Sequence, residues 1–447
     1  MGRAPADPTA GERVADRAAR NSVVRAVAEL VAKLASLALV FVLARRVGVD
    51  GLGVYIFAFA WAEVANLPVG YSADTCGAVY AAAVGVIFES LVNTVLAVFT
   101  GLERGGLTAV VLIFQRLLAA ALGLGALAAG LGVVAVLVGF AVAAASALVL
   151  AASLLVARVG RPSVAISKEG RRETRSRTFG FAAQEVFATG IARADTILLS
   201  LMGTTAAVGI YGAGYRLLES SLFIPLALTT AFAAMFTYLG RDSEPSVGAV
   251  YGYALKAALI LLVPCAVVLF LLAEPVLALF FGAGFDGAAT PLRLLAPVVV
   301  LLGAVIISTS LVISRRDPRA MVWAFAAALA VNVAANLLLI PPMGASGAAL
   351  GMLITYGLFA LVAFEMAART VGHPPLISTL AGALVAGGAM ALTLVVLLHG
   401  SALLAASTGV LVYLAVLVAV EWLFSPRDLR FATDMLRRYL PSSTRNA

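Results

Sequence analysis

The sequence predicts an all-α, polytopic membrane protein of about thirteen transmembrane helices, arranged as two pseudo-symmetric lobes around a central cavity. Hydrophobic residues make up 62% of the chain and charged residues 12%, whereas about a quarter of the residues of a soluble domain are charged. Apolar runs of about 20 residues recur from end to end, and each can cross a hydrocarbon core of about 30 Å. The runs are continuous and do not alternate with polar residues, which favours helices over the strands of a membrane barrel.

The apolar runs define thirteen expected spans. They cover residues 23–44, 53–70, 77–100, 107–129, 132–157, 179–201, 207–239, 250–281, 293–313, 320–340, 346–368, 376–398 and 402–424. The two cysteines, Cys76 and Cys265, lie in or beside these runs and show neither a disulfide framework nor the spacing of a metal site.

Basic loops set the expected orientation of the spans. Residues 1–21 form an Arg-rich tail, residues 158–178 a basic segment between the lobes, and residues 425–447 a basic tail. The connections at 203–207 and 341–347 are nearly neutral. Because positively charged loops stay in the cytoplasm, we expect a multi-pass protein of the cytoplasmic (cell) membrane with a cytoplasmic C-terminus.

The first spans do not fit this alternation. The N-terminal tail and the turn at residues 102–104 are both expected in the cytoplasm, yet three spans separate them. Either residues 70–85 make an extra short or re-entrant pass, or the N-terminus lies outside.

An internal echo in the sequence predicts the two lobes. Residues 48–55 read Gly-Val-Asp-Gly-Leu-Gly-Val-Tyr, and residues 203–211 read Gly-Thr-Thr-Ala-Ala-Val-Gly-Ile-Tyr. Internal repeats are the usual construction of secondary transporters, and chance similarity of glycine-rich turns is the alternative. We therefore expect a first lobe over residues 22–157, a second lobe over 179–368, and two additional helices over 369–424.

Ionisable side chains recur inside the apolar runs. A charged group at the centre of a membrane helix costs about 2.5–3.5 kcal/mol on insertion scales, so such groups face a cavity or a partner and mark candidate functional sites. The candidate substrate-binding residues are Arg25, Glu29, Lys33, Glu185, Arg193, Asp195, Arg216, Glu219 and Lys256. More remote charges are Glu63, Glu89 and Arg116.

Several Arg side chains beside carboxylates suit an anionic head group, because a guanidinium binds a phosphate or pyrophosphate through two parallel hydrogen bonds. Arg25, Glu29 and Lys33 follow one another at four-residue spacing and so share one helix face. An ion-pair ladder within that helix is the alternative to a cavity wall. Structural pairs that only hold helices in register are the alternative for the other charges.

Four blocks in the second half of the sequence have a recognisable order and spacing. They are Ala192–Leu199 with Ala207–Glu219, Phe280–Ala289 followed by Leu292–Ala296, Asn332–Pro341, and Gly344–Ala349. These blocks resemble the second lobe of polysaccharide and oligosaccharide flippases, a family of the multidrug/oligosaccharidyl-lipid/polysaccharide exporter superfamily. The resemblance covers about residues 176–370, and it extends less closely over 22–60 and 95–157.

The resemblance implies a flippase that moves undecaprenyl- or dolichyl-linked saccharides to the outer leaflet by alternating access, in polysaccharide biosynthesis. The implied partners are a lipid-linked saccharide with a polyprenyl phosphate or pyrophosphate, membrane lipids, and glycosyltransferases or a polymerase. It also implies that Arg25, Lys33 and Arg193 engage the phosphate, with Asp195 at the family's acidic position. No enzyme activity, cofactor, metal or nucleic-acid partner is expected.

The sequence departs from the family between Pro68 and Gly101, where there is room for one crossing instead of two. We therefore expect the first lobe to lack about one helix, which leaves a non-transporting homologue as an alternative. A cation-coupled multidrug exporter of the same superfamily is another. A polytopic glycosyltransferase or polymerase usually has a large outer loop or a metal-binding Asp cluster, and the sequence shows neither.

Overall fold

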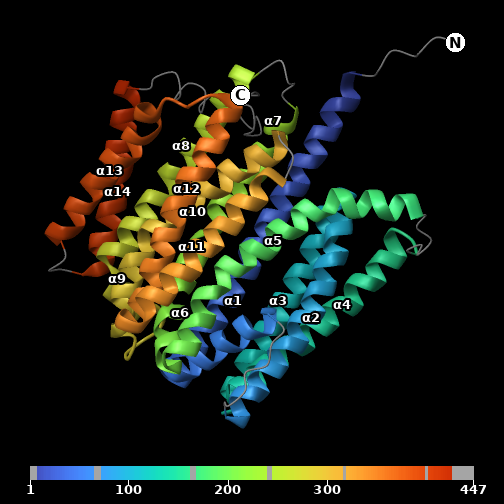
Figure 1. Cartoon of the computed structure of the whole chain (residues 1–447), viewed down its shortest axis with the longest axis vertical. Coiled ribbons are helices and arrows are strands. Elements are labelled where there is room, and N and C mark those ends of the chain that lie inside the picture. The colour runs from blue at the N-terminus through green and yellow to red at the C-terminus, as the bar shows by residue number, and fades with distance from the viewer. Residues whose placement is uncertain are drawn as a thin grey trace, which may run out of the picture.

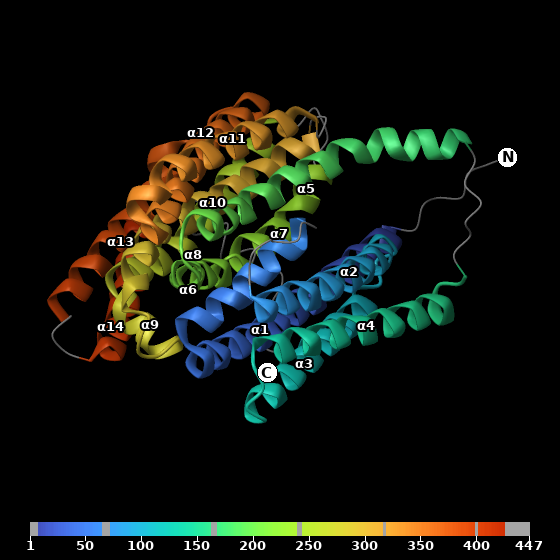
Figure 2. The ribbon, with the colours of Figure 1, turned by 60° about the horizontal axis from the view of Figure 1, so that its bottom comes forward.

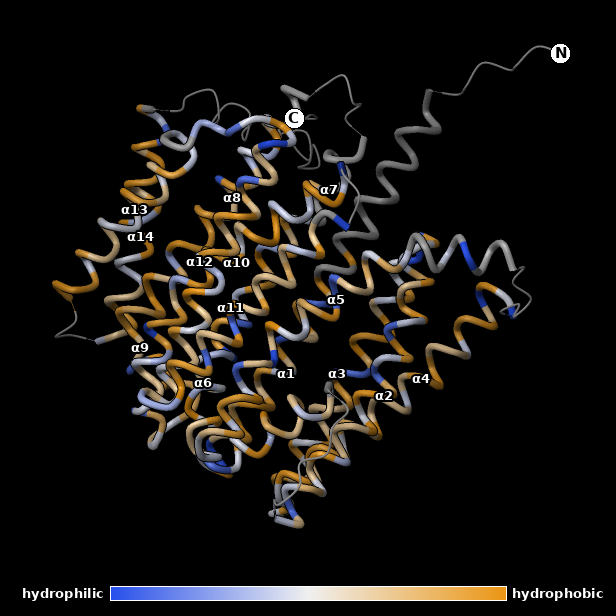
Figure 3. Tube along the Cα trace, in the orientation of Figure 1, coloured by the Kyte–Doolittle hydropathy of each residue, from blue (hydrophilic) through white to orange (hydrophobic). Residues whose placement is uncertain are grey.

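The computed structural model describes residues 8–64, 72–161, 168–238, 244–315, 319–397 and 401–424, and these residues form helices and no strand. Ten helices of the described part are long and apolar enough to cross a membrane. Figure 3 shows that hydrophobic residues predominate along most helices. The predicted fold class, an all-α multi-pass membrane protein, is confirmed.

The first lobe consists of α1 (Pro8–Val64), α2 (Ala73–Gly101), α3 (Gly105–Ala128) and α4 (Val133–Arg158). A kink at Gly48 divides α1, and its φ of 69° lies in the left-handed region that glycine adopts without a steric penalty. We call the part before this kink α1a and the part after it α1b. Figure 1 shows α1 reversing its direction at this point.

The second lobe contains eight helices. They are α5 (Lys168–Met202), α6 (Thr205–Ser221), α7 (Phe223–Tyr238), α8 (Glu244–Leu271), α9 (Ala273–Phe280), α10 (Ala289–Arg315), α11 (Arg319–Met343) and α12 (Ala345–Val371). The expected spans at 207–239 and 250–281 are each divided into two helices, α6 with α7 and α8 with α9. A proline lies in the first turn of both α7 and α9, where its missing N–H leaves no helical hydrogen bond unmade.

Two further helices, α13 (Leu376–Leu397) and α14 (Ala402–Phe424), pack on each other and on α8. They extend the second lobe on the side away from α1. Figure 1 shows them at the opposite edge of the molecule from α2, α3 and α4.

The two lobes repeat one packing pattern. In the first lobe α1 packs on α3, α3 on α4, and α2 on α4; in the second lobe α5 packs on α11, α11 on α12, and α10 on α12. Thus α1a corresponds to α5, α1b to α6, α2 to α10, α3 to α11, and α4 to α12. This correspondence matches the internal echo, because the kink at Gly48 leads into α1b as the turn at Gly203 leads into α6.

Within the described residues, no helix of the first lobe corresponds to α7, α8 or α9. The chain passes from the end of α1b at Val64 to the start of α2 at Ala73, whereas α7, α8 and α9 lie between α6 and α10. Among the described residues, the two lobes therefore differ between the end of α1b at Val64 and the start of α2 at Ala73. More than one helix of the second lobe has no counterpart.

The helices have two distinct ends. The end that carries Arg158, Lys168, Arg315 and Arg319 is called here the basic end, and the opposite end, which carries Gly48 and the start of α6, is called the neutral end. α1b and α2 both begin at the neutral end: Gly53 in α1b contacts Thr205, the first residue of α6, and Gly77 in α2 faces Val134, in the first turn of α4.

This arrangement accounts for the odd number of expected spans. α1b is about 24 Å long at 1.5 Å per residue, which is less than the hydrocarbon thickness of about 30 Å. The chain enters from the neutral end as α1b, and α2 begins again at that same end. The short extra pass is therefore α1b and not residues 70–85, and α1 starts at the basic end.

Candidate functional site

A cavity of about 760 Å³ lies between the lobes, in the half of the molecule nearer the basic end. Residues of α1a, α2 and α3 line it on one side, and residues of α6 and α7 line it on the other. Its charged lining residues are Glu29, Lys33, Arg116, Arg216 and Glu219. Four of these five are candidates predicted from the sequence.

Glu219 connects the two lobes across this cavity. The Lys33 ammonium group of α1 donates a hydrogen bond of 3.1 Å to the backbone carbonyl of Glu219. The Glu219 carboxylate is 2.7 Å from the Arg216 guanidinium, one turn earlier on α6. Electrostatic interactions also link Glu29 to Lys33 and Arg193 to Glu219. Cations from both lobes therefore surround one carboxylate.

Arg116 of α3 is a cavity residue that the sequence placed among the remote charges. Its guanidinium lies 2.5 Å from the Glu89 carboxylate of α2. The signal available in the sequence was an Arg within the apolar run at 107–129. The polar residues Asn93 and Thr108 also line the cavity, and the Thr108 hydroxyl is buried with no hydrogen-bond partner in the described structure.

Asp195 lies outside this cavity, inside the second lobe. Its carboxylate accepts hydrogen bonds from Tyr211 Oη at 2.7 Å, Asn332 Nδ2 at 2.8 Å and Asn336 Nδ2 at 2.6 Å. It is fully buried among α5, α6 and α11. The expectation that Asp195 faces the same cavity as Glu29 and Lys33 is wrong, because helix geometry gives the direction of a side chain and not its neighbours.

Lys256 also lies away from the central cavity. Its Nζ is 2.6 Å from Glu421 Oε2, and both side chains are buried. The pair joins α8 to α14. Lys256 also lines a smaller cavity of about 330 Å³ between α8 and the α12–α13 connection.

The other candidates are distributed along α1 and α5. Arg193 interacts electrostatically with Arg216 and Glu219. Glu185 is exposed at the midpoint of α5. The side chain of Arg25 lies outside the described part of the structure.

The neutral end of the molecule is closed by a symmetric crossing of α1b and α6. A Cβ atom on Gly53 would lie 2.1 Å from the carbonyl oxygen of Thr205, and one on Gly209 would lie 2.1 Å from that of Val49. The shift that aligns Gly53 with Gly209 also aligns Val49 with Thr205. The two contacts are therefore related by exchange of the lobes, and the echo in the sequence corresponds to this crossing.

A second contact supports closure at this end. Arg45 of α1a donates a hydrogen bond to the backbone carbonyl of Leu279 in α9. The ring of Phe41 packs against Phe280 and Phe281, with centroids 4.6 and 5.1 Å apart. The lobes thus meet at the neutral end, while the cavity lies between them toward the basic end.

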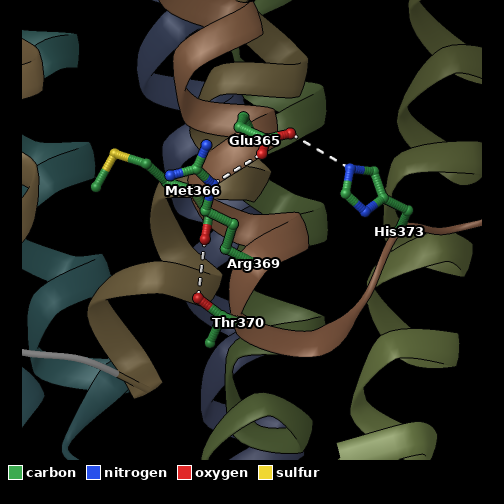
Figure 4. Close-up of polar contacts among 5 residues, drawn as sticks. All are labelled: Glu365, Met366, Arg369, Thr370 and His373. Carbon is green, nitrogen blue, oxygen red and sulfur yellow. Dashed lines mark hydrogen bonds and ion pairs between the residues drawn. The ribbon is translucent and has the colours of Figure 1, made fainter.

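A separate polar cluster lies at the end of α12. Arg369 Nε donates to Glu365 Oε1 at 2.8 Å, and His373 Nε2 is 3.3 Å from Glu365 Oε2. Figure 4 shows this cluster with the Thr370 hydroxyl bonded to the Met366 carbonyl. All three ionisable groups are exposed, which distinguishes them from the charges of the cavity. Among the described residues, no three His, Cys, Asp or Glu side chains are placed to hold a metal ion.

Comparison with known proteins supports the predicted resemblance. Residues 70–239 match the family model described as "Polysaccharide biosynthesis protein". A comparison with curated proteins gives no significant match.

Three solved structures share the fold. "Lipid II flippase MurJ, inward closed conformation" aligns with a TM-score of 0.65 and 14% identity, over 92% of this chain and 90% of that chain. A multidrug resistance MATE family transporter of the MOP superfamily, in an inward-facing conformation, gives 0.53 and 16%, over 79% and 90%. A variant of the Vibrio cholerae MATE transporter VcmN gives 0.53 and 15%, over 80% and 87%.

The TM-scores show a shared fold. The predicted two-lobed architecture is confirmed by the fold shared with flippases and transporters. That likeness also agrees with the prediction that the chain is not an enzyme.

Proposed function

We propose that the protein is a flippase that moves a lipid-linked saccharide across the cytoplasmic membrane by alternating access. The observation that carries the proposal is the cavity between the lobes, lined by Lys33, Arg116 and Arg216 against two carboxylates. Glycosyltransferases would supply the saccharide at the cytoplasmic face, and a polymerase would use it at the other.

The cavity charges suit a phosphate or pyrophosphate. Arg216 pairs with the Glu219 carboxylate and Lys33 donates to the Glu219 backbone carbonyl, so an entering anion can displace the carboxylate from Arg216 and bind the two neighbouring cations. Arg216 offers a planar guanidinium for two parallel hydrogen bonds. Because the two cations belong to different lobes, a bound head group would bridge α1a and α6.

The position of the cavity suits loading from the cytoplasm. By the distribution of basic residues, the basic end is the cytoplasmic end. The cavity lies toward this end, and the α1b–α6 crossing closes the other. Release on the outer side would require that crossing to separate, which is a population shift between two states of the protein.

Replacing Arg216 or Lys33 by alanine is expected to reduce flipping. Removal of a charge-assisted hydrogen bond weakens binding by about 1.5–3 kcal/mol, equal to about 10- to 150-fold in affinity. The measurement is translocation of a fluorescent undecaprenyl-pyrophosphate saccharide by the purified protein in proteoliposomes. Arg369→Ala, which removes an exposed guanidinium outside the cavity, is the matched control and should leave the rate unchanged. Transport by Arg216→Ala and Lys33→Ala at the parental rate would disprove the assigned roles.

Cation-coupled export is the second candidate, and the Asp195 cluster favours it. Asn336 Oδ1 is buried and has no hydrogen-bond donor within the described residues. Both amides now donate to Asp195, and rotation of each would turn the side-chain oxygens of Asn332 and Asn336 toward the carboxylate to surround a small cation. The buried Asp195 carboxylate supplies the negative charge that would attract the cation.

Asp195→Asn tests cation coupling. The substitution removes the charge and retains an oxygen acceptor, so transport that depends on a Na⁺ or pH gradient should lose that dependence. Ser308→Ala, a change at another buried polar site that bonds Tyr251, should keep it. If Asp195→Asn keeps the same gradient dependence as the parent, the cluster is not the coupling site.

A further inference from the structure

The smaller cavity, of about 330 Å³, lies at the basic end of the second lobe, where α13 packs on α8. Residues of α8, of the connection after α12 and of the start of α13 enclose it, among them Gly248, Gly252, Val371–Pro375, Ser378 and Thr379. Figure 2 shows α13 and α14 beside α8, at the edge of the molecule away from α2, α3 and α4. Within the described structure, this cavity shares no lining residue with the central cavity, so it is a separate candidate site.

The smaller cavity has an exposed mouth and a buried floor. Ala249, Gly372 and His373, which form the mouth, are exposed. Lys256 and Thr379 line it more deeply and are 6% and 5% exposed. Lys256 lies seven residues, about two helical turns, beyond Ala249 on α8. The cavity therefore leads from the surface of the protein to a buried ammonium group.

Two glycines of α8 shape this cavity. A Cβ atom on Gly248 would lie 2.7 Å from the carbonyl oxygen of Val371, so the backbone of the connection lies directly against α8 there. A Cβ atom on Gly252, one turn further along, would meet only Pro374 Cβ, at an ordinary contact distance of 3.5 Å. The first glycine thus allows the connection to approach α8, and the second leaves space on the helix face that carries Lys256.

The charges around the cavity favour an anion. Lys256 lines the cavity, and its ion-pair partner Glu421, at 2.6 Å, belongs to α14. The first turn of α13 contains no acidic residue, so no carboxylate there compensates the positive end of the helix dipole. At the mouth, His373 can take up a proton, and the neighbouring Glu365 carboxylate is already paired with Arg369 (Figure 4).

Two exposed tryptophans indicate that the floor lies at the level of the lipid head groups. Trp422 directly follows Glu421 on α14 and is 68% exposed, and Trp323, near the start of α11, is 80% exposed. Both lie near the basic end. Because Trp side chains collect at the membrane–water interface, the ion pair of Lys256 with Glu421 is placed close to the cytoplasmic interface.

We propose that the smaller cavity binds the phosphate group of an anionic membrane lipid through Lys256, and that the bound lipid fastens α13 to α8. Basic pockets between membrane helices on the cytoplasmic side are suited to phospholipid head groups, and the Arg-rich sequence after α14 attracts anionic lipids to the same face. The volume is at the lower end of the range for ligand pockets, which suits a head group whose acyl chains remain in the bilayer. The site lies outside the central cavity, so this inference is independent of the proposed flippase function.

Native mass spectrometry of the detergent-purified protein tests the lipid preference. The protein is titrated with phosphatidylglycerol and with phosphatidylcholine that has the same acyl chains. We expect one phosphatidylglycerol to bind about tenfold more tightly than phosphatidylcholine, because the choline group cancels the charge of the phosphate. Equal affinities for the two lipids would overturn the proposal, since the acyl chains and not the anion would then determine binding.

A variant that fills the cavity locates the bound lipid. Gly252→Leu places a side chain in the cavity, and Gly388→Leu on α13 is the size-matched control, because a Cβ atom on Gly388 would meet nothing within 4 Å. We expect Gly252→Leu to bind phosphatidylglycerol about tenfold more weakly, while Gly388→Leu binds it as the parent does. If Gly252→Leu binds the lipid as tightly as the parent, the lipid lies elsewhere and the proposal is wrong.

A double variant tests Lys256 without leaving a buried charge unpaired. Lys256→Met combined with Glu421→Leu removes both charges, and an apolar pair often replaces a buried ion pair without loss of stability. We expect this variant to fold as the parent does and to bind the two lipids with equal affinity. A retained preference for phosphatidylglycerol would show that Lys256 is not the contact for the phosphate.

Inorganic phosphate distinguishes a lipid from a soluble ligand with the same chemistry. We expect phosphatidylglycerol, and not inorganic phosphate at millimolar concentration, to raise the apparent unfolding temperature of the delipidated parent. Gly252→Leu should show no such rise, because its cavity is filled. If inorganic phosphate stabilises the parent equally and displaces the lipid, the site binds a soluble phosphate and the assignment to a lipid is overturned.

Discussion

Replacing Gly209 by alanine is expected to hold the neutral end of the protein open and to stop transport. The new Cβ would lie 2.1 Å from the carbonyl oxygen of Val49, far inside van der Waals contact. Backbone cannot rotate away as a side chain does, so α1b and α6 must move apart. Overpacking of this kind costs about 1–3 kcal/mol, which changes the ratio of two conformations by about 5- to 150-fold.

The position of the lobes can be measured with spin labels at the neutral end. Leu131→Cys, between α3 and α4, and Asp286→Cys, before α10, place one label on each lobe in a background with Cys76 and Cys265 replaced. Gly209→Ala should lengthen the main label-to-label distance and abolish flipping. Gly125→Ala is the control, because a Cβ there would meet nothing within 4 Å. Unchanged distances and transport in Gly209→Ala would refute the role of the crossing.

Lys256→Ala is expected to be the most destabilising single charge removal. It would leave Glu421 buried without its cation, and loss of one partner of a buried ion pair costs about 3–5 kcal/mol. A Cβ atom on Gly382 of α13 would lie only 2.4 Å from a carboxylate oxygen of Glu421. The backbone of α13 therefore packs closely against this carboxylate and restricts its contact with water. The apparent unfolding temperature of the detergent-purified protein should fall strongly.

Two further variants test the explanation by charge. Lys256→Met combined with Glu421→Leu removes both charges and should recover most of the lost stability, because an apolar pair of similar volume often replaces a buried ion pair without loss. Arg369→Ala breaks the exposed pair with Glu365 and should cost at most about 1 kcal/mol. If the double variant is as unstable as Lys256→Ala, lost packing and not the unpaired charge causes the loss of stability.

Much of the architecture was predictable because a membrane helix can be recognised from the apolar residues of its own segment. Apolar length predicts the spans, and the echo at Gly53 and Gly209 predicts two related lobes. The divisions of α6 from α7 and α8 from α9 were missed, since each pair lies in one continuous apolar run. A proline lies in the first turn of α7 and of α9, but Pro264 lies inside α8 without dividing it, so proline alone does not show where a helix is interrupted.

The site was predictable only in part, for a physical reason. A charge in an apolar run must have a partner or a cavity, but a single sequence does not show which. Lys33 and Glu219 do line the cavity, whereas Asp195 is held by donors from α6 and α11. Asn332 and Asn336 lie four residues apart on α11 and therefore on one helix face. This pair was the sequence signal for the buried site that binds Asp195.

The half-length α1b also bears on how the chain is inserted during synthesis. A segment that enters and leaves by the same end contributes no net crossing, so the sidedness of every later helix is independent of it. Loss of the counterparts of α7, α8 and α9 could therefore occur without inverting α2, α3 or α4. α2, α3 and α4 thus run in the same directions as α10, α11 and α12, although the described first lobe has no counterpart of α7, α8 or α9.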